Sequence, residues 1–138
     1  MRKLFVLLTA VALILVLAAC GGNGGTSDTG STGGDAARGE QLFKQTIIGS
    51  ASAPGCITCH SLEAGVVLVG PPQNNVGAEA GMRVPGQSAE DYLRESIVDP
   101  DAYVVDGYAP GLMYQFYGRD LTEQQIDDLV AYMLTLRN

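Results

Sequence analysis

The run Cys56-Ile57-Thr58-Cys59-His60 constrains this chain most, because it contains two of the three cysteines and the sole histidine. Its C-x-x-C-H spacing is the one at which a c-type haem is attached. Each cysteine can form a thioether bond to a haem vinyl group, and the adjacent imidazole can then bind the iron from below the ring. The motif predicts one covalently bound haem c, with iron, attached at Cys56 and Cys59 and ligated by His60.

Three other uses of this motif remain open. A thioredoxin-like redox pair would follow a strand in a βαβ pattern, and the sequence offers no such pattern. A structural zinc ion needs four Cys or His ligands, and Cys20 is assigned to another role below. A plain disulfide between the two cysteines would leave the adjacent histidine without a role.

The N-terminus has the features of an export signal. Arg2 and Lys3 precede an uncharged apolar stretch, residues 4–17, and the small residues that follow end at Cys20. This ending resembles a bacterial lipoprotein signal, in which the cysteine is acylated and becomes the new N-terminus. An uncleaved anchor is the alternative, since the stretch reaches the short limit of about 17–25 residues for a spanning helix. Either way the domain lies on the extracytoplasmic face of a bacterial membrane, and lipidation of Cys20 is preferred.

The sequence divides into three regions by composition. Residues 1–19 are the predicted signal peptide. The lipidated cysteine and a Gly/Ser-rich stretch at 20–35 have too few apolar side chains to order themselves, so we expect a flexible linker with a reach of about 20 Å. Residues 36–138 are expected to form one small domain.

The chain is acidic. Eight basic residues stand against 15 acidic ones, and the loss of Arg2 and Lys3 with the signal changes the net charge from −7 to −9. Nucleic acid is therefore not expected as a partner. A protein with a basic or mostly apolar docking patch is a better match.

Three segments have the pattern of α-helices. The first spans about 35–45 and has Asp35 as its N-cap. The second begins at Ser88 and ends before Pro100, because the residue before a proline is pushed out of the helical region. The third begins at Thr122 with a capping box and continues with apolar residues at helical spacing.

The stretch between His60 and Ser88 is rich in glycine and proline and is expected to be loop, with residues 66–69 as a possible short strand. A loop of this length needs a functional reason, and wrapping a haem edge would supply one. Three helices alone would form a thin core, which a covalently held macrocycle would fill. The predicted fold is all-α: three main helices and long loops around one haem c.

The second axial ligand is expected to be a methionine. The chain has no second histidine, and methionine is a common partner of histidine on haem iron. Met133 lies on the apolar side of the third helix, a position more typical of the core. Met113 lies in a loop where a proline, a glycine and aromatic residues suit a thioether above a ring. Met113 is preferred, and Met82, in a Gly-rich loop, is the alternative.

With these features, residues 38–138 resemble a class I monohaem cytochrome c. Gly39 and Phe43 resemble the family's first helix, which crosses the C-terminal helix, here near Leu129 and Tyr132. Met113, followed by aromatic residues and the start of the third helix, resembles the distal methionine segment. The chain departs from the family in one respect, since Tyr114 stands where a proline often follows this methionine.

The resemblance also implies a role for residues around the haem. Gly70-Pro71 resembles the Gly-Pro that follows the motif, which makes the Pro71 carbonyl the acceptor for Nδ1–H of His60, with Pro72 as the alternative register. The chain has no tryptophan, so contacts to the haem propionates are expected from Arg83 and some of the loop tyrosines. These tyrosines are Tyr103, Tyr108, Tyr114 and Tyr117.

The resemblance implies a one-electron carrier between respiratory or photosynthetic redox proteins, which dock at an exposed haem edge. Together with the signal that ends at Cys20, it predicts a membrane-tethered carrier. It is not expected to be an enzyme, to act on a small-molecule substrate or to bind nucleic acid. One alternative is a cytochrome c subunit of a larger quinol-oxidising or terminal oxidase complex. A less favoured alternative is a haem gas sensor or peroxidase in which Met113 is not bound, so that one coordination position of the iron is open.

Overall fold

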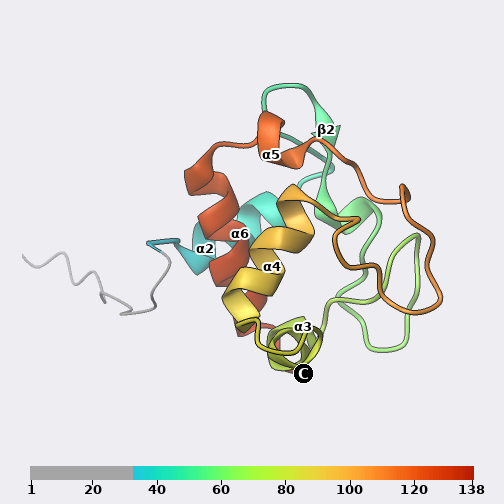
Figure 1. Ribbon diagram of the computed structural model, residues 1–138. Coiled ribbons are helices and arrows are strands. Elements are labelled where there is room, and N and C mark those ends of the chain that lie inside the picture. The colour runs from blue at the N-terminus through green and yellow to red at the C-terminus, as the bar shows by residue number, and fades with distance from the viewer. Residues whose placement is uncertain (1–32) are drawn as a thin grey trace, which may run out of the picture.

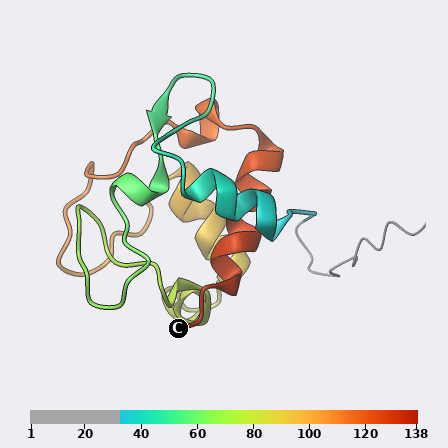
Figure 2. The same cartoon turned by 180° about the vertical axis from the view of Figure 1, so that it is seen from behind.

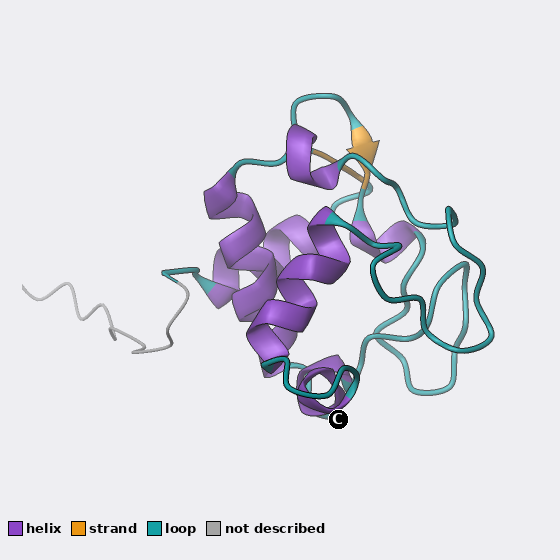
Figure 3. Cartoon of the chain, in the orientation of Figure 1, coloured by secondary structure: helices purple, strands orange, loops and turns teal. Residues whose placement is uncertain are grey.

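The computed structural model describes residues 33–138, which form a predominantly helical domain (Figure 1). The predicted signal peptide, Cys20 and most of the predicted linker lie outside the described residues. The longer helices are α2 (Ala36–Phe43), α4 (Ala89–Val98) and α6 (Glu123–Thr135). The shorter elements are β1 (Ile47–Ile48), β2 (Ala53–Pro54), η1 (Cys56–Thr58), α3 (Val76–Glu79), η2 (Ala80–Met82) and α5 (Tyr117–Asp120). The all-α prediction is confirmed, with one two-stranded antiparallel hairpin as a small addition (Figure 3).

The three longer helices begin at the predicted N-caps. The Asp35 carboxylate accepts two backbone N–H groups of the first turn of α2. The Ser88 hydroxyl caps α4 in the same way, and Thr122 and Gln125 form the predicted capping box at the start of α6. The first helix ends at Phe43, earlier than the sequence predicted, because the chain turns there toward the hairpin.

Helix α2 crosses α6 at Gly39, as expected from the resemblance (Figure 2). A Cβ atom on Gly39 would overlap the backbone carbonyl of Asp128 and press against Tyr132. One turn further on, the rings of Phe43 and Tyr132 meet edge to face with centroids 5.5 Å apart. The absence of a side chain at Gly39 thus allows the two backbones to approach closely.

A buried carboxylate joins the same two helices. Asp128 accepts hydrogen bonds from the backbone N–H of Asp35 at 2.7 Å, from two guanidinium nitrogens of Arg38 at 2.8 Å each and from the Gln124 amide at 2.9 Å. Burial opposes the charged form, but these hydrogen bonds outweigh it and hold the pKa of Asp128 below its usual range. The carboxylate therefore remains ionised and fixes the start of α2 on α6.

Two long loops, residues 59–75 and 99–116, project from the same flank of the helices and lie side by side in both views (Figures 1 and 2). Residues 66–69, considered above as a possible strand, are loop, because no neighbouring strand pairs with them in the described part of the chain. The expected loop before Ser88 instead contains α3 and η2. The backbone N–H of Gly77 in α3 donates to the carbonyl of Leu136 at 2.9 Å, which fixes this short helix against the C-terminal segment.

Within residues 33–138, no helix combines the length and the apolar character that a membrane span requires.

Candidate functional site

A cavity of about 500 Å³ lies between the helices and the two long loops. Its volume is within the range of about 300–1,000 Å³ that is usual for small-molecule and cofactor sites. Most of its lining is apolar and aromatic, with side chains from α4, α6 and both loops. The residues that the sequence predicts to bind haem all line it: Cys56, Cys59, His60 and Met113.

The short helix η1 brings the motif to the cavity. The backbone N–H groups of Cys59 and His60 both donate to the Cys56 carbonyl, at 3.1 and 2.9 Å. The Thr58 hydroxyl closes the turn by donating to the Gly55 carbonyl at 2.6 Å. This tight turn explains how residues so near in sequence can present two thiols and an imidazole to one cavity.

Neither thiol has a disulfide partner, and the Cys56 thiol lacks the lowered pKa of a reactive cysteine. Cys56 and Cys59 are both free. Burial raises the pKa of the Cys56 thiol to about 12, whereas redox-active pairs of the thioredoxin type depend on a lowered thiol pKa. Within residues 33–138, no group of three or more His, Cys, Asp or Glu side chains could hold a metal ion. The redox-pair, disulfide and zinc interpretations of the motif therefore gain no support.

The imidazole of His60 is held in one orientation. Its Nδ1 lies 2.9 Å from the carbonyl oxygen of Pro71. A carbonyl can only accept, so Nδ1 carries the proton and Nε2 keeps a lone pair for a metal. The backbone of Gly70 lies against the ring so closely that a Cβ atom there would overlap it. Burial lowers the pKa of His60 against the opposing effect of the Pro71 hydrogen bond, which favours the neutral, metal-binding imidazole.

Sequence reasoning did not identify Gln73 as part of the site. Its side chain is buried, its Nε2 lies 3.2 Å from Nδ1 of His60, and its Oε1 has no hydrogen-bond partner. The segment after Pro71 turns back on the motif, because the Gln73 N–H donates to the Ser61 carbonyl at 2.8 Å. Only the nearness of Gln73 to Pro71 in sequence could have drawn attention to it.

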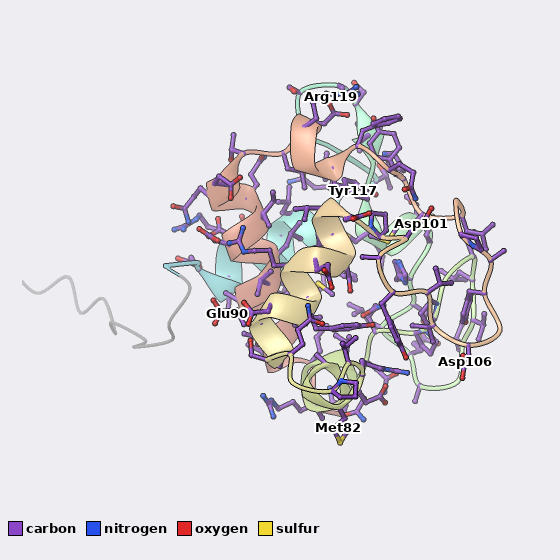
Figure 4. The ribbon with its side chains drawn as sticks, in the orientation of Figure 1. Met82, Glu90, Asp101, Asp106, Tyr117 and Arg119 are labelled. Atoms are coloured by element: carbon purple, nitrogen blue, oxygen red, sulfur yellow. The ribbon has the colours of Figure 1, made fainter. Side chains whose placement is uncertain are left out.

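The three candidate methionines occupy different environments. Met113 is half-buried and lines the cavity, and Met133, which is 8% exposed in α6, also reaches its wall. Met82 is 76% exposed and does not belong to the cavity lining; Figure 4 shows it at the outer surface of the domain. The structure therefore brings the preferred residue, Met113, together with His60 and places the alternative, Met82, elsewhere.

Aromatic residues anchor the chain after Met113. The Tyr114 hydroxyl donates to the Asp120 carboxylate at 2.6 Å, which raises the pKa of Tyr114. The rings of Tyr114 and Tyr117 meet edge to face at 5.0 Å. Before the methionine, the carboxylate of Asp101 accepts the backbone N–H of Gly111 at 2.9 Å. The methionine loop is thus fixed on both sides, although Tyr114 replaces the expected proline.

The residues expected to contact the haem propionates differ in their position relative to the cavity. The four loop tyrosines all line the cavity: Tyr103, Tyr108, Tyr114 and Tyr117. Arg83 does not line it. One helical turn separates Glu79 from Arg83, and the two side chains form an ion pair. In this arrangement Arg83 is paired with Glu79 outside the cavity lining, and its contact with a propionate stays a prediction.

The residues of the cavity suit a covalently attached haem. Two free thiols, a neutral imidazole with an available Nε2 and a thioether side chain are the donors that such a group uses. The remaining wall is apolar enough to cover a macrocycle.

Comparisons with known proteins agree with this geometry. A family model described as cytochrome c matches residues 36–137. Cytochrome c2 of Rhodomicrobium vannielii is 33% identical over 111 residues, which cover 74% of this chain and 79% of that protein. No solved structure gives a significant match.

Proposed function

This chain belongs to the cytochrome c family of haem electron-transfer proteins with covalently bound haem c, and we propose that Cys56 and Cys59 are its attachment sites. In this proposal the iron is bound between His60 and Met113. Haem iron alternates between the ferrous and ferric states and so carries one electron at a time. The observation that carries the proposal is the position of these four side chains in the lining of one cavity.

The surrounding residues have distinct tasks in this proposal. The Pro71 carbonyl fixes the tautomer and the ring plane of His60. The apolar wall excludes water from the iron, and the anchored tyrosines keep the Met113 loop in place. A pocket whose loops are anchored by such hydrogen bonds suits an electron carrier rather than an enzyme, because its geometry need not change as an electron enters or leaves.

We also propose that the protein works outside the cytoplasm, tethered through a lipid on Cys20. The signal-like N-terminus and the Gly/Ser-rich composition of residues 21–35 support this. The linker would let the domain sample an area of membrane surface around its anchor, where it would meet its redox partners. Growth of cells on labelled palmitate, with the parent protein and with Cys20→Ser, tests the tether. The parent protein should take up the label and the variant should not, and equal labelling of the two would contradict lipidation of Cys20.

An anaerobic redox titration with optical spectra tests the electron-carrier proposal. The holoprotein should titrate as a single one-electron couple with a low-spin spectrum in both oxidation states. Mass spectrometry of proteolytic fragments should find the haem on the peptide that contains residues 56–60. Extraction of the haem by acidified organic solvent would contradict covalent attachment. A high-spin spectrum with rapid carbon monoxide binding would contradict a six-coordinate iron.

A further inference from the structure

The surface around the cavity is unusually apolar. Residues 66–69 carry four aliphatic side chains that are 39–57% exposed, and Leu112 on the neighbouring loop is 54% exposed. Val69 and Leu112 also belong to the cavity lining, so this apolar surface borders the haem site directly. Contiguous exposed apolar side chains of this kind typically mark a binding surface. We call residues 63–69 together with 99–112 the loop face.

The loop face carries negative charge and no positive charge. Residues 45–82 and 95–118 contain no lysine or arginine. The exposed acidic residues of the two loops are Glu63, Asp99, Asp101 and Asp106. Figure 4 shows Asp101 and Asp106 on the flank formed by the loops, away from Glu90 on α4. Five basic residues between 33 and 138 form ion pairs within the domain, and Arg38 with Asp128 and Arg83 with Glu79 are two examples.

We propose that the loop face docks a redox protein whose own docking surface is apolar at its centre and lysine- or arginine-rich at its rim. This inference rests on the proposed haem site, since it names the partner of that site. Burial of the aliphatic side chains would hold the complex together, and the carboxylates would steer a basic partner toward the haem edge. The same carboxylates disfavour an acidic partner or a second copy of this chain, because like charges would meet across the contact.

Two small oxidants of opposite charge test this inference on the ferrous full-length holoprotein. Tris(phenanthroline)cobalt(III) is cationic and aromatic, and ferricyanide is anionic. In stopped-flow experiments, Asp106→Lys should slow oxidation by the cobalt complex by about threefold and accelerate oxidation by ferricyanide, because the charge lies beside the docking site. Glu90→Lys makes the same change of charge on the opposite flank and should alter both rates by less than about 1.5-fold.

The apolar part of the proposal has its own variant. Leu68→Ser should lower the rate of oxidation by the aromatic cobalt complex and leave the rate of oxidation by ferricyanide unchanged. Ile47→Ser, at a position that is 60% exposed in β1 and outside the cavity lining, is the matched control and should leave both rates unchanged. Loop variants that behave like their controls would overturn the docking proposal. A holoprotein that neither oxidant reoxidises would instead contradict the electron-carrier proposal.

A separate observation assigns a positioning role to Gln73. Nδ1 of His60 already donates to Pro71, so the Nε2 donor of Gln73 at 3.2 Å cannot also bond to it. In this orientation Nε2 of Gln73 makes only a long contact of 3.5 Å to the Pro71 carbonyl, and Oε1 has no partner. The two ends of an amide are distinguished by their hydrogen bonds, and rotating this one by half a turn gives up that long contact and brings Oε1 beside Nδ1–H. We infer that Gln73 is a second acceptor for the Nδ1 proton of His60, in addition to Pro71.

A second acceptor would make the imidazole a stronger electron donor to the iron and so favour the ferric state. Gln73→Leu should therefore raise the reduction potential and shift the Nδ1 proton resonance of the ferrous holoprotein toward a weaker hydrogen bond. Gln87→Leu is the matched control, because Oε1 of Gln87 is also buried without a partner, but Gln87 does not line the cavity.

The outcomes separate the possible roles of Gln73. A raised potential in Gln73→Leu, with no change in Gln87→Leu, supports the inference. A loss of thermal stability in Gln73→Leu with an unchanged potential and an unchanged proton resonance would overturn it. A parent holoprotein without a histidine-ligated spectrum would contradict the ligand assignment of His60, on which this inference depends.

Discussion

The hydroxyl of Tyr117 donates a hydrogen bond of 2.6 Å to the carbonyl oxygen of Pro54, across 63 positions of sequence. Pro54 lies just before the C-x-x-C-H motif, and Tyr117 follows the Met113 loop. The Tyr117 ring is buried, and this burial raises the pKa of its hydroxyl, so the group remains a donor at neutral pH. The contact therefore joins the two segments that carry the proposed proximal and distal ligands.

Tyr117→Phe removes this contact with little change in shape. We expect the free energy of unfolding to fall by about 0.5–1.5 kcal/mol, and more if the Pro54 carbonyl is left without a partner. Denaturant unfolding of the holoprotein measures the change. Tyr132→Phe is the control, because it keeps the edge-to-face contact with Phe43 and should be nearly neutral. Equal effects of the two substitutions would show that the Tyr117 hydrogen bond contributes nothing specific.

Gly39→Ala tests the close crossing of α2 and α6. The new methyl group would overlap the Asp128 carbonyl, so the helices must separate, at a cost of about 1–3 kcal/mol or more. Thermal unfolding should show a clearly lower midpoint. Gly81→Ala is the matched control, since a Cβ atom there meets its neighbours at 3.6 Å or more. A Gly39→Ala protein as stable as the control would mean that the two helices are not held at this distance.

The Asp128 carboxylate should make stability depend on pH. Its folded pKa lies below the unfolded value of about 3.9, so its contribution is fully present above that value and is lost as the pH falls through the folded pKa. Asp128→Asn should reduce the free energy of unfolding at pH 7 by about 1–3 kcal/mol, because buried donors lose a charged acceptor. The difference from the parent protein should shrink as the pH is lowered below 4.

A control separates this effect from a general loss of negative charge. Glu40→Gln removes an exposed ion pair with Lys44 and should change stability by no more than about 0.5 kcal/mol at any pH. If the difference in free energy of unfolding between Asp128→Asn and the parent protein did not change with pH, the acid-sensitive stability would not come from Asp128.

Gly70→Ala tests the packing of the Gly70 backbone against the His60 imidazole. A methyl group at this position would overlap the imidazole and displace it from the Pro71 carbonyl. We expect a lower yield of holoprotein and a mixture of low-spin and high-spin haem in its absorption and electron paramagnetic resonance spectra. Gly65→Ala provides a comparison in the same loop, because its Cβ meets open space although its positive φ of 73° adds backbone strain. A purely low-spin Gly70→Ala protein would contradict the proposed packing.

Local patterns in the sequence were sufficient to predict the main helices. Asp35, Ser88 and Thr122 cap them as expected, since capping depends on residues within one turn. The crossing at Gly39 was predicted from the resemblance rather than from local pattern. The four proposed haem-binding residues could be selected because the chain has only one histidine and few cysteines and methionines.

Features that depend on distant contacts were missed. Asp128 has no local signal of burial, and its partner Arg38 lies 90 positions away. The short helix α3 forms in a Gly- and Pro-rich stretch because the C-terminal segment supports it through Gly77. The ion pair of Arg83 with Glu79 is, by contrast, a local contact across one helical turn. The proximity of Gln73 to His60 could not be predicted from the sequence, because it depends on how the loop folds back on the motif.

The absorption spectrum of the ferric Met113→Ala holoprotein tests the central claim most directly. The His60/Met113 site predicts that this variant loses the thioether-to-iron absorbance band and its six-coordinate low-spin character. Met133→Leu, a volume-conserving change at the other methionine of the cavity wall, should keep both features. A Met113→Ala spectrum identical to that of the parent protein, or loss of the band in Met133→Leu, would contradict the account.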